Sequence, residues 1–356
     1  MVTLFLIIIV ISILILVHEW GHFYSARRLG IKVEEFGFGF PPKVFSRVKN
    51  GITYSFNLLP FGGFVKIFGE HGEGEGDQDS FISRPAWQRF VILGAGVFMN
   101  LVLAWVFFSA GSVAGVPRLA EGENVSGIPV SIIGIMPDSP ADKAGIKFGD
   151  MILEMRARDI SLRIESKDDV RDFVDAYRGE EITMALRRGE EIREVTLKPR
   201  VNIPEGEGPI GVALGRIEFV KTPWYLAPIE GGRVLVRTVS ATVLGFWELI
   251  RELAVSGRAP VAVSGPVGIF FMADDTRSLG FTYFIQFVGI LSVNLAILNF
   301  LPIPALDGGR VLFLAIEKIK GSRVSPRIEN AVHAVGFVLF VFLMILITYR
   351  DVANIF

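Results

Sequence analysis

The stretch LILVHEWGHFYSARRLG (residues 14–30) begins as hydrocarbon and then places His18, Glu19 and His22 where a membrane span should be ending. An ionisable side chain at the centre of a membrane helix costs about 2.5–3.5 kcal/mol on insertion scales, so such residues usually have a function. The rest of the chain is therefore expected to contain the groups that make these three residues tolerable.

Composition favours a membrane protein. The chain has 356 residues and 51% of them are hydrophobic, whereas soluble proteins reach about 45–50% only when glycine is counted. The formal net charge of −1 argues against nucleic acid as a partner. Because the chain has no cysteine, a metal ion would have to be held by histidine, aspartate or glutamate.

Four apolar stretches are long enough to cross a bilayer, which takes about 20 residues. A secretory signal peptide is a poor alternative for the first, because no Lys or Arg precedes it and no small-residue cleavage site follows it. We expect a retained span there. The four stretches are residues 2–17 (extended by the His-Glu turn to about 26), 90–117, 278–306 and 330–349.

Positively charged segments predict the orientation of these spans. Residues 27–89 carry nine Lys and Arg, and residues 307–329 carry five. By the positive-inside tendency both segments face the cytoplasm, so residues 118–277 lie outside, as do both termini. We expect a multi-pass protein of the cell inner (cytoplasmic) membrane.

The segment after the first span has a β-type pattern. Tyr54 and Phe56 alternate with polar neighbours within residues 51–70, and the Gly62-Gly63 pair marks a break. This segment is either a small cytoplasmic hairpin or an apolar hairpin that dips into the membrane. In the second case an edge strand could pair with an extended substrate.

Residues 126–200 are predicted to form a soluble α+β module. Short β-like runs are followed by an amphipathic helix at 167–177 and by a hairpin at 181–199. Residues 231–257 could be misread as a fifth span, but Arg237 and the charged cluster of Glu248, Arg251 and Glu252 favour an interfacial or packed helix. The predicted domains are an N-terminal membrane half (1–116), the inserted module (117–205), an extracytoplasmic linker with an amphipathic helix (206–277) and a C-terminal membrane half (278–356).

His18 and His22 are spaced to hold one metal ion from one face of a helix, and the adjacent Glu19 can polarise a bound water. Two core histidines beside a paired carboxylate are the alternative, but they leave Glu19 without an evident counter-ion. A catalytic zinc usually takes three protein ligands, and His333 and Asp307 are the candidates for the third. Asp307 follows 29 uncharged residues and itself needs a partner, which favours it.

Asp307 lies in NFLPIPALDGGR (residues 299–310), where Pro302 and Pro304 break the third apolar stretch. Such breaks at membrane depth commonly line a cavity. Asn299 could donate a hydrogen bond to a developing oxyanion. Alternatively, Asn299 joins two helices and Asp307 caps the helix that follows.

The motifs HEWGH (18–22) and NFLPIPALDGG (299–309) resemble the site-2 protease family of intramembrane zinc metalloproteases (peptidase family M50B), in its bacterial RseP/RasP-like branch. The likeness covers nearly the whole chain, including SGPVGIF (264–270). SPADKAGIKFGDMIL (139–153) resembles a bacterial PDZ domain, present once here although some members carry two. The resemblance implies a polytopic α-helical membrane protein with about four transmembrane helices. A membrane-associated β-hairpin or sheet and an inserted soluble α+β PDZ-like domain complete the expected fold.

The resemblance also implies the roles of individual residues. His18, His22 and Asp307 would bind Zn2+, and Glu19 would act as general base and acid. Substrate binding would involve Asn299, Pro302, Pro304 and a membrane-reentrant β-loop containing Gly62, Gly63 and Phe64.

We therefore expect intramembrane proteolysis near the cytoplasmic side of the membrane, by Glu19-assisted attack of zinc-bound water on a single-span protein in the lipid bilayer. By resemblance, the substrates are anti-sigma factors already trimmed by an upstream site-1 protease, and remnant signal peptides. A PDZ-bearing membrane scaffold is an alternative that leaves Glu19 and Asp307 unexplained. A metal transporter is another, but it would need further polar residues along the other spans.

Overall fold

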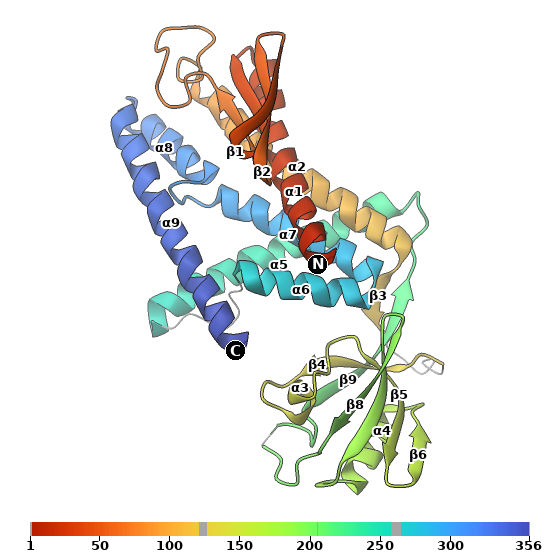
Figure 1. Ribbon diagram of the computed structural model, residues 1–356. Helices are drawn as coiled ribbons and strands as arrows, with labels where there is room; N and C mark the ends of the chain where they lie inside the picture. The colour runs from red at the N-terminus through yellow and green to blue at the C-terminus, as the bar shows by residue number, and fades with distance from the viewer. Residues whose placement is uncertain (1, 121–126, 205, 258–264, 356) are drawn as a thin grey trace. The chain divides into compact units, whose positions relative to one another are not determined.

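The computed structural model describes residues 2–120, 127–204, 206–257 and 265–355. In this part of the chain, four helices are long and apolar enough to cross a membrane, which confirms the four predicted spans. Residue 264 of the SGPVGIF motif, and residues 121–126 and 205 of the predicted inserted domain, lie outside the described residues. The four helices are α1 (Val2–Arg28), α2 (Ala86–Ala114), α7 (Phe281–Phe300) and α9 (Pro326–Ile355) (Figure 1).

The chain divides into two compact units, of which the first comprises Met1–Ala110, Leu226–Ala273 and Gln286–Phe356, and the second Gly111–Tyr225 and Asp274–Ile285. The remaining strands are β1 (Val33–Lys49), β2 (Ile52–Ile67), β3 (Val116–Leu119), β4 (Val130–Ile135), β5 (Met151–Ala157), β6 (Ile160–Arg163), β7 (Ile182–Arg188), β8 (Glu191–Leu197) and β9 (Val212–Val220). The remaining helices are α3 (Pro140–Lys143), α4 (Lys167–Ala176), α5 (Ala227–Ser256), α6 (Pro266–Leu279) and α8 (Asp307–Lys320).

Helices α1 and α2 approach each other closely where both carry glycine. A Cβ atom added to Gly21 would lie 2.4 Å from the backbone oxygen of Ala95, closer than non-bonded atoms can pack. Small residues that let backbones touch are the usual basis of helix association in membranes, because lipid provides no hydrophobic force between apolar helices. Gly21 lies between His18 and His22, so this contact brings α2 against the histidine-bearing turn of α1.

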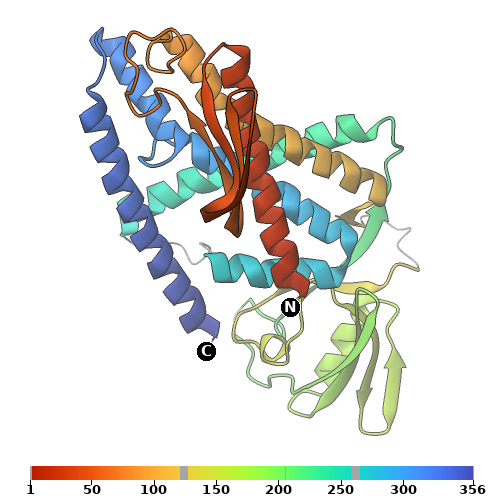
Figure 2. The ribbon, with the colours of Figure 1, turned by 45° about the horizontal axis from the view of Figure 1, so that its top comes forward.

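Strands β1 and β2 fold into a bent hairpin with more than one register. Residues 33–40 pair with residues 53–59 and also with residues 63–67, so that the first arm of β1 lies between the two arms of β2. Residues 43–49 and 63–67 are consequently the free edges. Figures 1 and 2 both show the hairpin alongside α1.

Over residues 55–59 of β2 the polar side chains are buried and the apolar side chains are exposed, which is the reverse of the arrangement in a soluble sheet. Ser55 and Asn57 are buried, whereas Phe56 and Leu58 are 50% and 60% exposed. Soluble sheets place the polar residues outward, but a sheet in contact with lipid gains by turning its apolar side chains out. The apolar exposure therefore favours the membrane-dipping alternative for this hairpin.

The bend of β2 around Pro60 and Gly62, between its two arms, packs against the apolar part of α1. The Ser12 hydroxyl donates a 2.6 Å hydrogen bond to the backbone oxygen of Pro60. A Cβ atom on Gly62 would lie 2.9 Å from the Ile15 side chain. The bend thus reaches the level of α1 that consists of hydrocarbon side chains, one turn before His18.

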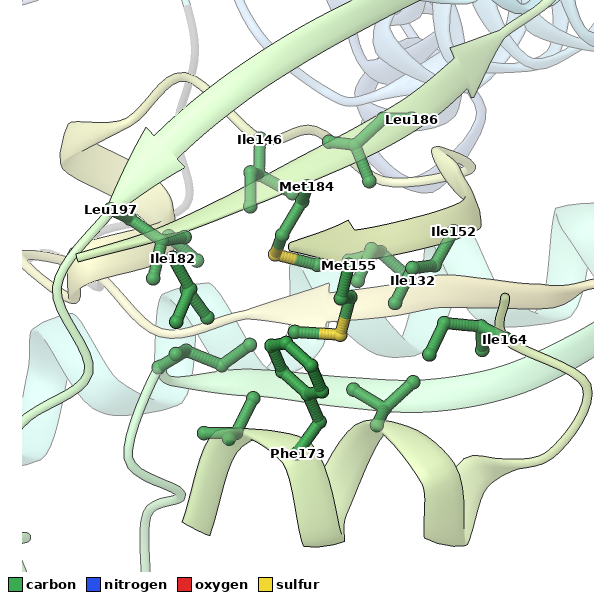
Figure 3. Packing of buried hydrophobic residues seen from close by; sticks show 14 of the residues in the cluster. Ile132, Ile146, Ile152, Met155, Ile164, Phe173, Ile182, Met184, Leu186 and Leu197 are labelled. Atoms are coloured by element: carbon green, nitrogen blue, oxygen red, sulfur yellow. The ribbon is translucent and has the colours of Figure 1, made fainter. Parts of the chain in front are cut away.

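The inserted domain has a six-strand path in the order β3-β9-β4-β5-β7-β8, with β6 paired to β5. Helix α4 begins in a capping box, where Ser166 and Asp169 satisfy each other's backbone amides. Its buried residue Phe173 packs toward Met155, Met184 and other residues of the sheet (Figure 3). The predicted hairpin is present as β7 and β8, with Gly189 in the turn.

The region predicted to be a linker with one amphipathic helix (206–277) contains strand β9 and helix α5 and most of helix α6. Strand β9 pairs with β3 and β4, so the sheet continues beyond the predicted boundary at residue 205. Helix α6 was not predicted. The helix predicted within residues 231–257 is α5, and it packs on membrane helices: Thr242 donates a 3.1 Å hydrogen bond to Asn294 of α7, and Gly231 contacts Ser109 of α2.

Replacing Gly21 with alanine should destabilise the fold, because the new methyl group meets backbone that cannot rotate away. Overpacking of this kind costs about 1–3 kcal/mol. Gly94→Ala on α2 is the matched control, since a Cβ there meets no heavy atom within 4 Å. We expect a lower thermal midpoint for Gly21→Ala in detergent and an unchanged or slightly higher one for Gly94→Ala. Equal midpoints would contradict the close approach of the two helices.

Candidate metal centre

Helix α1 presents His18 and His22 on one face, one turn apart, as the four-residue spacing predicts. Their Nε2 atoms lie 3.1 Å from each other, and the rings meet edge to face. Both side chains are buried, at 5% and 6% exposure. Two imidazoles whose Nε2 atoms face one another this closely are arranged to share one ligand.

Asp307 comes to the same point from the first turn of α8. Its Oδ2 lies 2.9 Å from Nε2 of His18 and 3.2 Å from Nε2 of His22. To bind a metal ion at this point, the Asp307 carboxylate must be ionised.

The break before α8 positions this carboxylate. A Cβ on Gly308 would lie 2.1 Å from the backbone oxygen of Leu301, and one on Gly309 would lie 2.6 Å from that of Ile303. The two glycines therefore let the first turn of α8 fold directly against the preceding loop. On the other side, His333 of α9 accepts a 3.0 Å hydrogen bond from the backbone amide of Ala305.

The donor set fits zinc. Among the described residues, His18, His22 and Asp307 form a group of three whose ligand atoms are mutually close enough for one ion. Ligands at about 2.0–2.2 Å from a tetrahedral zinc stand about 3.3–3.6 Å apart. The three separations here are slightly shorter, at 2.9, 3.1 and 3.2 Å. His333, the other candidate for the third ligand, is not in this group.

Glu19 is not a member of this group and contacts the β-sheet instead. Its Oε2 accepts a 3.0 Å hydrogen bond from the backbone amide of Val65. Val65 lies in the 63–67 edge and pairs with Phe36 on its other side. The carboxylate next in sequence to a predicted metal ligand is thus held beside a free strand edge.

Within the described part of the chain, the triad side chains form no hydrogen bond with the predicted substrate-binding residues, which lie on three separate segments. Asn299 is half-buried in the last turn of α7, eight residues before Asp307. Pro304 packs against Gly336 of α9, and Pro302 is exposed. Gly63 and Phe64 lie on the edge arm of β2, where they pair with the first arm of β1, and Gly62 precedes them in the bend against α1.

Helix α2 contributes groups that the sequence analysis did not identify. His22 Nδ1 lies 2.8 Å from the backbone oxygen of Ile92, so it donates its proton there and leaves Nε2 with a lone pair. A Cβ on Gly96 would lie 2.4 Å from His22 Nε2. Asn100, fully buried, lies 3.3 Å from His18 Nδ1. The sequence feature that could have identified Asn100 is its amide side chain, which stands within an otherwise apolar part of the span.

The chain is similar along most of its length to proteins named as zinc metalloproteases. The profile described as Peptidase family M50 matches residues 6–343. A protein named as a zinc metalloprotease in Clostridium perfringens is 35% identical over 342 residues, which is 96% of each chain. The zinc metalloprotease RasP of Oceanobacillus iheyensis is 29% identical, with all of both chains covered.

A solved PDZ domain from an SdrC-like protein of Listeria monocytogenes is also similar. It matches 26% of this chain and 93% of its own length at 19% identity, with a TM-score of 0.22, which is too low to assign the fold of the inserted domain. The family match needs no such support, because it spans both halves of the metal centre. The chain belongs to peptidase family M50.

Proposed function

We propose that this protein is a zinc-dependent protease that cleaves single-span membrane proteins within or beside the lipid bilayer. The observation that carries the proposal is that the buried His18 and His22 and the half-buried Asp307 meet at one point among membrane helices. The carboxylate of Glu19 lies next to His18 in the sequence and is bound by the Val65 amide. A zinc ion held there would act as a Lewis acid on a water molecule and on the scissile carbonyl.

Glu19 supplies the proton transfers. It follows a metal ligand in the sequence and is fixed by the Val65 amide rather than by the triad. In this position Glu19 takes a proton from the attacking water and returns it to the leaving amine. Asn299 and the loop through Pro302 and Pro304 would contact the substrate on the opposite side, where α7 ends.

The 63–67 edge offers the substrate a strand to pair with. A helical segment hides its carbonyl groups in its own hydrogen bonds, so a peptide must be extended before it can be cleaved. Pairing with a sheet edge holds a peptide in that extended form. Gly63 and Phe64 belong to this edge, and Val65 connects it to Glu19.

The remaining aspects of the proposal concern location and substrate. Arg27 and Arg28 end α1 just beyond His22, which supports an active site near the cytoplasmic side of the inner membrane, with the inserted domain outside. Anti-sigma factors trimmed by a site-1 protease, and remnant signal peptides, are single-span proteins of the class that this site would accept.

Two substitutions separate metal binding from proton transfer. Glu19→Gln should retain zinc and lose at least about 100-fold in cleavage, because general acid–base catalysis contributes about 10²–10⁴-fold. Asp307→Asn should lose both zinc and cleavage. Zinc content by elemental analysis and cleavage of a reconstituted single-span substrate are the measurements. Undiminished cleavage by Glu19→Gln would overturn the assigned chemistry.

Proline at position 65 tests the edge strand. Val65→Pro removes the one backbone amide that holds Glu19, at an edge position where proline is tolerated. We expect cleavage to fall about tenfold or more while zinc content and the thermal midpoint stay near wild type. Val65→Thr keeps the amide and the β-branched shape and should retain activity. Full activity in the proline variant would show that the amide is dispensable.

A further inference from the structure

One face of α2 lies along both histidines of the triad. Ile92, Gly96 and Asn100 are spaced four residues apart, so they form a single stripe on the helix. Ile92 accepts the Nδ1 proton of His22 through its backbone oxygen. Gly96 leaves space for both rings, because a Cβ there would lie 2.4 Å from His22 and 2.7 Å from His18. Asn100 completes the stripe beside His18.

Asn100 is held rigidly at this point. Its side chain is fully buried, and its backbone oxygen accepts a 2.8 Å hydrogen bond from the hydroxyl of Ser292 on α7. The side-chain Nδ2 lies 3.3 Å from His18 Nδ1, while Oδ1 has no hydrogen-bond partner among the described residues. A buried amide oxygen without a partner destabilises the folded protein, so its presence here calls for a function.

The chemistry of His18 identifies that function. For Nε2 to bind a metal ion it must carry a lone pair, and the ring proton must then sit on Nδ1. That proton needs an acceptor, and the amide of Asn100 is the side chain within reach. A half-turn about the Cβ–Cγ bond exchanges the oxygen and nitrogen of an amide within the same space, and it brings Oδ1 to Nδ1.

We propose that Asn100 is a positioning residue for the metal centre: its Oδ1 accepts the Nδ1 proton of His18 and fixes that ring as an Nε2 ligand. The inference rests on the proposed zinc site and deepens it. It makes the two histidines equivalent, since each donates its outer proton to a group on α2. The backbone oxygen of Ile92 cannot be removed by substitution, whereas the amide of Asn100 can.

Asn100→Leu is the test, because leucine keeps the side-chain volume and removes the acceptor. Loss of such an outer hydrogen bond typically weakens metal binding by about 10–100-fold. We expect that loss for zinc in the detergent-solubilised chain, measured by competition with a chelating indicator. The visible absorption of the Co2+-loaded chain should change as well, because a ring that is free to tilt alters the ligand field.

Asn294→Leu is the matched control. It makes the same substitution in the same helical bundle, at an amide that bonds Thr242 and does not contact His18. Zinc affinity and the Co2+ spectrum should remain those of wild type. A loss in this control equal to that in Asn100→Leu would overturn the inference, since any amide of the helical bundle would then have the same effect.

Asn100→Asp tests the acceptor role specifically. A carboxylate also accepts the Nδ1 proton, so zinc affinity should return to within a few-fold of wild type or become tighter. A folded Asn100→Asp variant that binds zinc as weakly as Asn100→Leu would overturn the assignment of Oδ1 as acceptor. Thermal midpoints without metal identify folded variants, and Asn100→Ala replaces the leucine variant if that one does not fold.

The two proposals fail in different ways. Wild-type affinity and spectrum in folded Asn100→Leu would overturn the role of Asn100 and leave the zinc site intact. A wild-type chain that binds no zinc would overturn both.

Discussion

Two buried imidazoles and a half-buried carboxylate among membrane helices impose the constraint that shapes this protein. Removing a charge from water costs several kcal/mol unless protein groups compensate it, and lipid has none to offer. His18, His22 and Asp307 compensate one another within 3.2 Å. The outer nitrogens of both rings face polar groups of α2. Three segments from distant parts of the sequence must therefore meet at one point before the site is tolerable.

Glycine makes this meeting possible. The absence of a side chain at Gly21 lets the α2 backbone approach α1, and at Gly96 it leaves space for both imidazoles. At Gly308 it lets the first turn of α8 pack against the preceding loop. Membrane helices depend on such small residues for their association in any case. Here the same contacts assemble the site, so that packing stability and metal-site geometry are properties of the same few positions.

The sequence predicted the parts of the site that follow local rules. The spacing of His18 and His22 depends only on helix periodicity, and Asp307 is conspicuous as a charge after a long apolar run. The four spans, predicted from long apolar runs, and the family, predicted from its motifs, were also confirmed. Asn100 could not be identified in this way, because one amide in a span has no periodic signal and its role depends on a contact with α1. Strand β9 was missed because its pairing partners are distant in sequence.

The hairpin of β1 and β2 illustrates that one alternating pattern buries its polar face when lipid surrounds the sheet and its apolar face when water does. The period of two in β2 was predicted correctly, but it does not specify which face is buried, and here Ser55 and Asn57 lie inside while Phe56 and Leu58 face out. At membrane depth an unpaired sheet edge must face protein, because lipid offers its backbone groups no hydrogen-bond partners. Glu19 occupies part of the edge through the Val65 amide. A peptide that paired along residues 63–67 would therefore use the other outward-facing groups of this edge, because the Val65 amide remains bound to Glu19. The same edge would then hold the substrate and the general base side by side.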